Sequence, residues 1–255
     1  MIAIKAVSRF KAASWHLLIS AAIAAATLAI MLALWYPPPL FQAMGGTELA
    51  ILIVGVDVAI GPLLTLIIFD TKKKELVFDL AVIAAIQLAA LCYGIYAMHA
   101  GRPAFIAFVE NRFAVVSAAE LEPEALANAR LPEFRALSLT GPKLVAVDMP
   151  SDPKEVEAIM LASTMGLGAQ HLPKYYAPYT ERRQMVVSAA RPLSGLRNLT
   201  TEETARLQDA VAAAKAGGRE LRYLPVLTKL AILTALTDAR SGELVEIVAV
   251  NPAKE

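Results

Sequence analysis

The chain has 255 residues, of which 57% are apolar, and its 24 basic residues nearly balance its 23 acidic ones. Soluble domains average about 45–50% apolar residues, so the composition excludes an ordinary soluble protein and indicates a chain that is partly embedded in a membrane. The formal net charge of +1 gives no support for nucleic-acid binding, and we expect no nucleic-acid partner.

Three apolar runs occupy the first two fifths of the chain, at residues 17–36, 49–69 and 76–98. A transmembrane helix needs about 20 consecutive apolar residues, so each run is long enough to span a bilayer. The sequence therefore predicts a three-helix transmembrane domain over residues 1–101, followed by a second domain over residues 102–255.

The orientation follows from the lysines and arginines that flank these runs. Lys5, Arg9 and Lys11 precede the first run, and Lys72 to Lys74 follow the second, whereas residues 37–47 carry only polar and apolar side chains. Because basic residues favour the cytoplasmic side, we expect a cytoplasmic N-terminus and a C-terminal domain outside, in the periplasm of a bacterium. The membrane lipid is then an expected partner.

Asp57 lies near the middle of the second run and is the most costly residue there. Insertion scales put an acidic side chain at a helix centre at about +2.5–3.5 kcal/mol. Counted at about 1.5 Å per residue from the apolar edges, Asp57, Gln87 and Thr27 lie at similar depths of roughly 15–18 Å. We expect these three side chains to form one polar layer in the bundle, with a protonated Asp57 donating to the amide oxygen of Gln87.

Two interpretations of this layer remain. The layer either serves only to specify how the helices pack, or Asp57 stays available to a partner helix that carries a positive group. Gly61 and Pro62 belong to the same region, because proline removes the helical hydrogen bond to the Val58 carbonyl, which a neighbour or water must then satisfy. Asp79 lies roughly 13 Å from the depth of Asp57, too far for the carboxylate pair of an aspartyl protease, whose members are about 3 Å apart.

The region from residue 102 to 255 predicts an α+β domain, because strand and helix patterns alternate without a βαβ rhythm. Near residue 201, Thr201 with Thr204 and the acids Glu202 and Glu203 predict the capped start of a helix. In chain order the expected elements are a hairpin of strands 104–108 and 112–117, helix 123–130, strand 144–147, helices 153–165, 180–190 and 201–215, strand structure within 226–237, and strand 244–250.

No catalytic, cofactor or metal motif is apparent in the sequence, so we expect neither an enzyme nor a cofactor nor a metal site. One polar and aromatic cluster is notable in the second domain. It either forms an interaction surface, since tyrosine and arginine are favoured there, or belongs to a loop packed on its own domain. Its members are Tyr175, Tyr176, Tyr179, Arg182 and Arg183.

A series of short motifs, in order along roughly residues 35–117, resembles the TfpX/TfpZ family of type IV pilin accessory proteins. The resemblance rests on Tyr36-Pro37, Gly45-Gly46, Val56-Asp57, Gly61-Pro62-Leu63-Leu64-Thr65, Lys72-Lys73, Asp79-Leu80, Gln87, Tyr93-Gly94 and Arg102-Pro103.

The resemblance implies an inner-membrane accessory protein, chaperone-like and without catalytic activity, that supports type IV pilus assembly or dynamics. It also implies a partner, the type IV major pilin, whose apolar N-terminal helix waits in the inner membrane. We then expect Asp57, Gln87, Gly61, Pro62 and Thr27 to contact that helix, and the periplasmic domain to cover the pilin head. The alternative is a small transporter or proton-coupled module that uses Asp57 as a relay.

Overall fold

The computed structural model describes residues 8–253, which places Lys5 outside the described residues. The chain divides into two compact units, Met1–Ala33 with Gly46–Ala100, and Leu34–Gly45 with Gly101–Glu255. The sequence predicts a domain boundary between residues 101 and 102. In the structure, the segment that connects the first two apolar runs belongs to the second unit.

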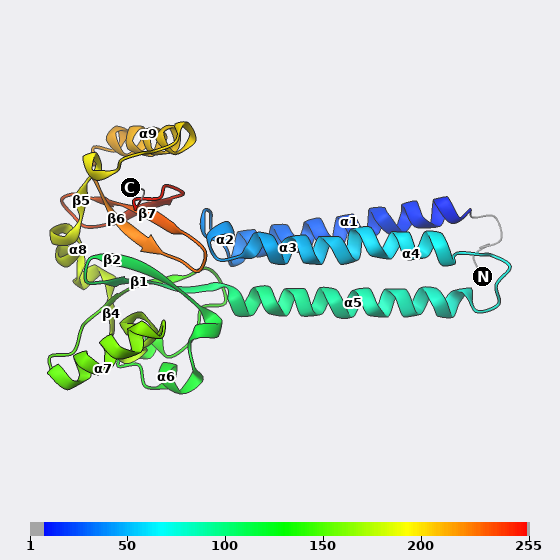
Figure 1. The fold of residues 1–255 in the computed structure, drawn as a ribbon, viewed down its shortest axis with the longest axis horizontal. Helices are drawn as coiled ribbons and strands as arrows, with labels where there is room; N and C mark the ends of the chain where they lie inside the picture. Colours follow the sequence, from blue (N-terminus) through cyan, green and yellow to red (C-terminus); the bar gives the residue numbers. More distant parts are fainter. Residues whose placement is uncertain (1–7, 254–255) are drawn as a thin grey trace. The chain divides into compact units, whose positions relative to one another are not determined.

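The first unit consists of long helices that lie side by side (Figure 1). The second apolar run is continuous but changes its hydrogen-bond pattern at a π-helical turn in the middle. Three helical segments of 23–26 residues are long and apolar enough to cross a membrane, which confirms the three predicted runs as helices and supports a membrane protein. The elements are α1 (Arg9–Leu34), α3 (Gly46–Val54), η2 (Gly55–Ile60), α4 (Gly61–Ile68) and α5 (Leu76–Gly101).

Helix α1 begins eight residues before the apolar run from which its depth was counted. The residues between Arg9 and His16 are helical, because their polar side chains do not prevent helix formation. The N-terminal end of this helix is therefore further back along the chain than a count from the apolar run assumes.

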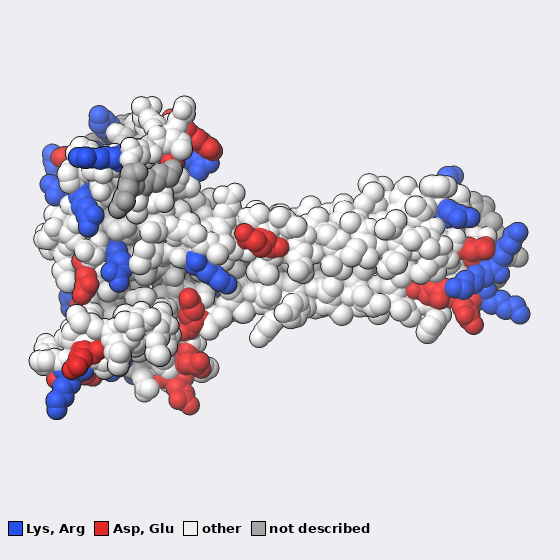
Figure 2. Space-filling view, viewed as in Figure 1, with Lys and Arg blue, Asp and Glu red and all other residues white. Residues whose placement is uncertain are grey.

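The outer surface of the helices is apolar along most of its length, and charged residues gather at the end where α4 joins α5 (Figure 2). Large side chains such as Trp15, Ile51 and Ile67 are mostly exposed, as expected for helices in contact with lipid. At the charged end, Lys73 Nζ forms an ion pair with Asp79 Oδ2. The pair places Asp79 in contact with the lysines between α4 and α5.

The second unit is built on an eight-stranded mixed sheet. Its strands are β1 (Pro103–Val109), β2 (Arg112–Ser117), β3 (Lys143–Val147), β4 (Tyr176–Pro178), β5 (Arg191–Pro192), β6 (Leu221–Leu227), β7 (Ile232–Asp238) and β8 (Leu244–Val248). The order is β4-β3-β1-β2-β6-β7-β8, and β5 pairs with β6. The β1–β3 and β2–β6 pairs are parallel and the other pairs are antiparallel.

Four α-helices of the second unit accompany the sheet, namely α6 (Pro123–Ala127), α7 (Pro153–Thr164), α8 (Arg183–Ala189) and α9 (Thr201–Ala216). A fifth, α2 (Leu40–Ala43), lies in the connecting segment. The predicted β1–β2 hairpin and the predicted helices are present, which supports an α+β arrangement. The predicted strand region 226–237 contains parts of two strands, β6 and β7, because the chain turns between them.

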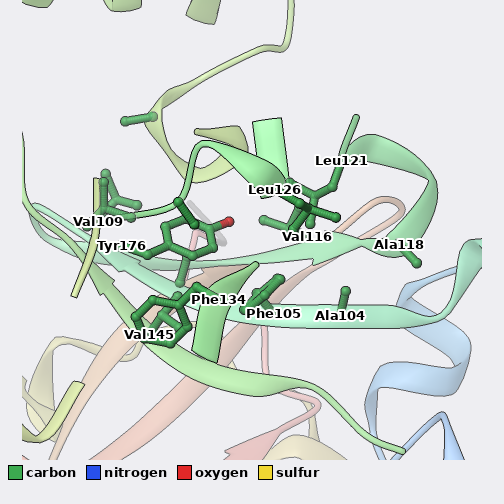
Figure 3. Close-up of a cluster of buried hydrophobic side chains, with 14 of the residues drawn as sticks. Ala104, Phe105, Val109, Val116, Ala118, Leu121, Leu126, Phe134, Val145 and Tyr176 are labelled. Carbon is green, nitrogen blue, oxygen red and sulfur yellow. The ribbon is translucent and has the colours of Figure 1, made fainter. Parts of the chain in front are cut away.

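Two apolar cores flank the sheet of the second unit. One core packs α6 and α7 against β1, β2 and β3, and its aromatic centre is Phe105, Phe134 and Tyr176 (Figure 3). The three rings meet edge to face at centroid distances of 5.0–6.4 Å. The other core packs α9 against β6, β7 and β8. These clusters fix the positions of the loops that connect strands and helices.

Helix α9 begins at Thr201 as predicted, but its N-cap is one residue earlier than the sequence indicated. Thr200, and not Thr201, is the N-cap: its hydroxyl accepts from the Glu203 amide at 3.2 Å, and the Glu203 carboxylate accepts from the Thr200 amide at 2.9 Å. Reciprocal capping of this kind satisfies two backbone donors at once. This reciprocal arrangement requires a glutamate three residues after the N-cap. Glu203 is three residues after Thr200, so Thr200 and not Thr201 fulfils the requirement.

The connecting segment 34–45 is anchored to the sheet side of the second unit. Trp35 Nε1 donates to the carbonyl of Leu139 at 3.1 Å. The carbonyl of Ala43 accepts both the Thr228 hydroxyl and the Leu230 amide at 3.0 Å. Tyr36 is fully buried in this unit. The segment is thus held to loops about 100 and 185 residues further along the chain.

Candidate functional site

The polar centre of the helical unit starts from a backbone defect next to Pro62. In the π-helical turn η2, the Gly61 amide donates to the carbonyl of Val56, five residues back. The next donor in that pattern would be residue 62, directed at the carbonyl of Asp57. Proline has no N–H group, so the Asp57 carbonyl is left without its backbone partner.

Gln87 of α5 supplies the missing hydrogen bond. Its Nε2 donates to the carbonyl of Asp57 at 3.0 Å. An unsatisfied carbonyl in lipid costs several kcal/mol, so a neighbouring donor is required there. The sequence predicted a freed carbonyl at Val58, four residues before the proline. The π-helical turn moves it to Asp57, and Gln87 is the neighbour that satisfies it.

Close approach of the two helices depends on Gly61. A Cβ placed at this position would lie 2.0 Å from Gln87 Nε2. Only glycine therefore leaves room for the amide of Gln87 against the backbone of the second apolar segment. Gly61 and Pro62 are both buried.

His16 of α1 completes the network. Its Nε2 lies 2.8 Å from Gln87 Oε1, and its Nδ1 lies 2.6 Å from Thr65 Oγ1. Because the Gln87 oxygen can only accept, Nε2 carries the proton of this bond. Nδ1 accepts from the Thr65 hydroxyl when the ring is neutral and donates to it when the ring is charged. The network therefore accommodates both protonation states of His16.

The side-chain carboxylate of Asp57 lies in a different environment from the backbone carbonyl of the same residue. The residue is only 6% exposed, and Oδ1 has no hydrogen-bond partner among residues 8–253. The predicted bond from a protonated Asp57 to Gln87 is wrong, because Gln87 bonds the backbone carbonyl of Asp57 and Oδ1 has no partner among these residues. Buried carboxyl oxygens without a partner are uncommon in folded proteins.

Asp57 lines a groove of about 320 Å³ between α1 and α5. One face of each helix forms its walls, since the lining residues recur at spacings of three and four. They are His16, Ile19, Ser20 and Ile23 of α1, and Ala84, Gln87, Leu88 and Leu91 of α5. Ile19, Ile23 and Leu88 are about half exposed or more. The groove therefore has apolar outer walls and a polar base.

Thr27 does not share this groove. It lines a separate small pocket with Met31, Ile53 and Met98. The prediction of one layer formed by Asp57, Gln87 and Thr27 is corrected in this respect, and His16 occupies the place on α1 that Thr27 was expected to fill. The physical reason is the earlier start of α1, which moves the N-terminal end of the helix back by eight residues.

His16 and Thr65 are the site residues that the sequence argument missed. His16 lies seven residues into α1, roughly 10 Å along the helix. A count of depth from Arg9, the first residue of α1, would have placed it inside the bundle. His16 also puts a second ionisable side chain in the groove that Asp57 lines.

The tyrosine and arginine cluster of the second unit is divided by the structure. Tyr176 and Tyr179 are buried, and their hydroxyls donate to the carbonyls of Gln170 and Gly242. Burial raises the pKa of both phenols. These two side chains therefore belong to a loop packed on its own domain and are not part of an exposed interaction surface.

The remaining members of that cluster have different environments. Arg182 holds Asp148 in a bidentate pair with N–O distances of 2.7 and 2.8 Å, and this hydrogen bonding lowers the pKa of Asp148. Tyr175 is half buried and lines another pocket. The backbone of Arg183 packs close to Gly242, at whose position a Cβ would lie 2.3 Å from the Arg183 carbonyl oxygen.

Within residues 8–253, no group of three or more histidine, cysteine, aspartate or glutamate side chains is arranged to hold a metal ion. The polar groups of the helical unit are a carboxylate, an imidazole, an amide and a hydroxyl. This set suits recognition of a cation or of a hydrogen-bond donor, because the carboxylate oxygen that faces no partner is an acceptor.

Comparison with known proteins gives a consistent set of relatives. Residues 4–45 match the sequence model of the family described as fimbrial assembly protein FimB. The chain is 31% identical to the fimbrial assembly protein of serogroup I from Dichelobacter nodosus, and 30% identical to that of serogroup E1. Each of these matches covers 216 residues, 84% of this chain and 84% of the relative.

A further relative, the fimbrial assembly protein of serogroups C1 and C2, is 36% identical over 108 residues, which cover 42% of this chain and 82% of that protein. No solved structure matches the chain.

The close fit of Gly61 against Gln87 generates a stability prediction. Gly61→Ala displaces the Gln87 side chain and breaks its bonds to Asp57 and His16, so we expect the free energy of unfolding to fall by about 1–2 kcal/mol. The matched control is Gly55→Ala in the same apolar segment, where a Cβ meets nothing within 4 Å. Thermal unfolding of the purified protein in detergent measures both. Equal melting temperatures for the two variants would contradict the packing described.

The Asp148–Arg182 pair generates a pH prediction. Because the pKa of Asp148 is lower in the folded protein, its stabilisation is present above the unfolded pKa of about 3.9. It is lost as the pH falls through the folded-state pKa. We expect Asp148→Asn to destabilise by about 1 kcal/mol at pH 7, and the difference from wild type to shrink as the pH falls through that range. Asp209→Asn, at an exposed position on α9, is the control; a pH-independent difference for Asp148→Asn would refute the ion-pair account.

Proposed function

The chain belongs to the fimbrial assembly protein family, and from that premise we propose that it acts in pilus assembly by binding a type IV pilin through the groove between α1 and α5. The single observation that carries the proposal is the buried, unpartnered carboxyl oxygen of Asp57 at the base of an apolar groove. The finer assignment to TfpX/TfpZ is part of this proposal.

The proposed location is a bacterial inner membrane, with the N-terminus in the cytoplasm and the second unit in the periplasm. Three apolar helices support the membrane location. The orientation is supported by Arg9 and Lys11 at the start of α1, and by Lys72 to Lys74 between α4 and α5. These basic residues belong on the cytoplasmic side by the usual charge bias.

An apolar helix is the proposed occupant of the groove. Each wall presents residues at helical spacing, and helix-in-groove binding uses such faces. The apolar walls alone give little selectivity, because lipid tails are equally apolar. Selectivity then comes from the polar base, where Asp57 and Gln87 meet the polar group of the incoming helix.

A cationic group on that helix fits the base best. Burial of a carboxylate in lipid is costly when it is unpaired, and a positive partner offsets that cost. A pilin helix with a charged mature N-terminus would supply such a group. In this proposal the protein holds pilin and does no chemistry, so it needs no cofactor.

A second candidate function is favoured by one observation. His16 and Asp57 line the same groove, so two ionisable side chains lie in one membrane pocket. Chains of aspartate and histidine form proton relays in transporters. A proton-coupled module would therefore show proton flux in proteoliposomes that depends on both residues, whereas a pilin-binding protein would show none.

The proposed function predicts a defined effect of mutating Asp57. Asp57→Asn removes the charge at constant shape, and Asp57→Leu removes the polar group. We expect both variants to reduce pilin co-purification about tenfold, which corresponds to about 1.4 kcal/mol of binding free energy. Quantitative recovery of pilin with the tagged protein, extracted from native membranes in mild detergent, measures the effect.

The matched control is Asp79→Asn, which removes a carboxylate of α5 that is paired with Lys73 at the charged end of the bundle. Its pilin recovery should equal that of wild type. Unchanged pilin binding in both Asp57 variants, with the protein folded and inserted, would rule out the proposed role of the groove.

A further inference from the structure

The second unit contains a separate pocket of about 480 Å³ between α6, α7 and the loop around residues 167–175. Pockets that hold small ligands or inserted side chains range from about 300 to 1,000 Å³. One face of α7 forms a wall, with Glu155, Ala158, Ile159 and Ala162 at spacings of three and four residues. We name this cavity the α6–α7 pocket.

The interior of the α6–α7 pocket is apolar and lined by small residues. Alanines form part of its walls, namely Ala125 of α6 and Ala158 and Ala162 of α7. Because their side chains are short, an incoming chain can approach the backbone closely. The surface of α7 next to the pocket is also apolar, because Leu161 is 69% exposed and Met165 is 83% exposed. Exposed methionines are typical of surfaces that adapt to a protein partner.

The rim of the α6–α7 pocket is acidic. Glu120, Glu122 and Glu155 line it, with Lys174 as the basic residue among the lining side chains. Lys174 is itself engaged, since its Nζ lies 3.2 Å from Glu155 and 4.5 Å from the centre of the Tyr175 ring. Glu120 accepts from the amide and hydroxyl of Ser117 through Oε2. Three glutamates against one lysine still leave the rim with an excess of negative charge, and Glu122, which makes no cap hydrogen bond, is the carboxylate most open to a cation.

A second, independent observation points to a ligand. The side chain of His171 lines the α6–α7 pocket and is only 10% exposed. Its Nδ1 is buried and has no hydrogen-bond partner among the described residues. Nε2 lies 4.0 Å from Glu120, at the limit of an ion pair. A buried polar atom of this kind lacks a partner that a bound chain can supply through its backbone.

We propose that the α6–α7 pocket is a docking site for a partner polypeptide whose apolar side chains are flanked by a lysine or arginine. The apolar side chains enter the pocket, the cation meets Glu122 and Glu120 on the rim, and a polar group of the chain bonds His171 Nδ1. An anionic membrane surface is disfavoured as the occupant, because the acidic rim repels it. The site goes beyond the proposed function, since it is remote in sequence from the groove and does not require that groove.

Photo-crosslinking in intact cells tests the proposal with the full-length protein. A benzoylphenylalanine at Ala158, inside the pocket, should give a polypeptide adduct whose crosslinked peptide, identified by mass spectrometry, is apolar with a lysine or arginine within a few residues. The same probe at Met160, on α7 but outside the lining, should give at least fivefold less of it. A lipid adduct, a crosslinked peptide of other composition, or no adduct at Ala158 would overturn the proposal.

Charge variants provide the matched controls. Glu122→Lys reverses a rim charge on a side chain that makes no cap hydrogen bond, and it should lower the adduct yield about three- to tenfold. Lys174→Gln makes the rim more acidic and should raise the yield. Glu157→Lys makes the same charge change on an exposed residue of α7 outside the pocket, and should leave the yield unchanged. Equal effects of Glu122→Lys and Glu157→Lys would contradict the rim's role.

The crosslinking result for the α6–α7 pocket can be distinguished from the pilin-binding result for the groove between α1 and α5. The adduct at Ala158 should persist in the Asp57→Asn background if a partner other than the groove's occupant docks there, and should fall with pilin recovery if one pilin fills both sites. Either result supports the α6–α7 pocket as a docking site, whereas the contrary outcomes named above count against it in both backgrounds.

Discussion

The carbonyl of Asp57 cannot receive a backbone hydrogen bond, because residue 62 is a proline and the turn before it is π-helical. The rest of the helical centre depends on this constraint. Gln87 must donate to that carbonyl, Gly61 must leave room for Gln87, and His16 must take up the remaining oxygen of the amide. One missing N–H thus fixes how three helical segments approach one another.

The same constraint separates the two parts of Asp57. Its carbonyl is used to hold α5, whereas its carboxylate faces the groove without a partner among the described residues. The two interpretations of the polar layer, packing and recognition, are therefore compatible. Gln87, His16 and Thr65 hold the helices together, and the carboxylate of Asp57 is left for the recognition that we propose. In the proposed function its partner is a pilin helix.

The sequence allowed prediction of the three long helices, because length and hydropathy decide membrane spans, and of the β1–β2 hairpin and α9 from their turn and cap residues. The depth argument found Asp57 and Gln87 but chose Thr27 in place of His16. Apolar runs do not show where a helix begins, and polar residues at the N-terminal end of α1 are helical. The eight-stranded sheet order also escaped prediction, since the parallel β1–β3 and β2–β6 pairs join strands distant in sequence.

Site-specific crosslinking from the wall of the groove tests the central claim most directly. A photo-reactive residue in place of Leu88, whose side chain is 62% exposed beside Asp57, would be introduced in native membranes that contain pilin. The account predicts an adduct to the apolar helix of pilin that is lost when Asp57→Asn is added. An adduct of the same yield in both backgrounds would contradict recognition by Asp57.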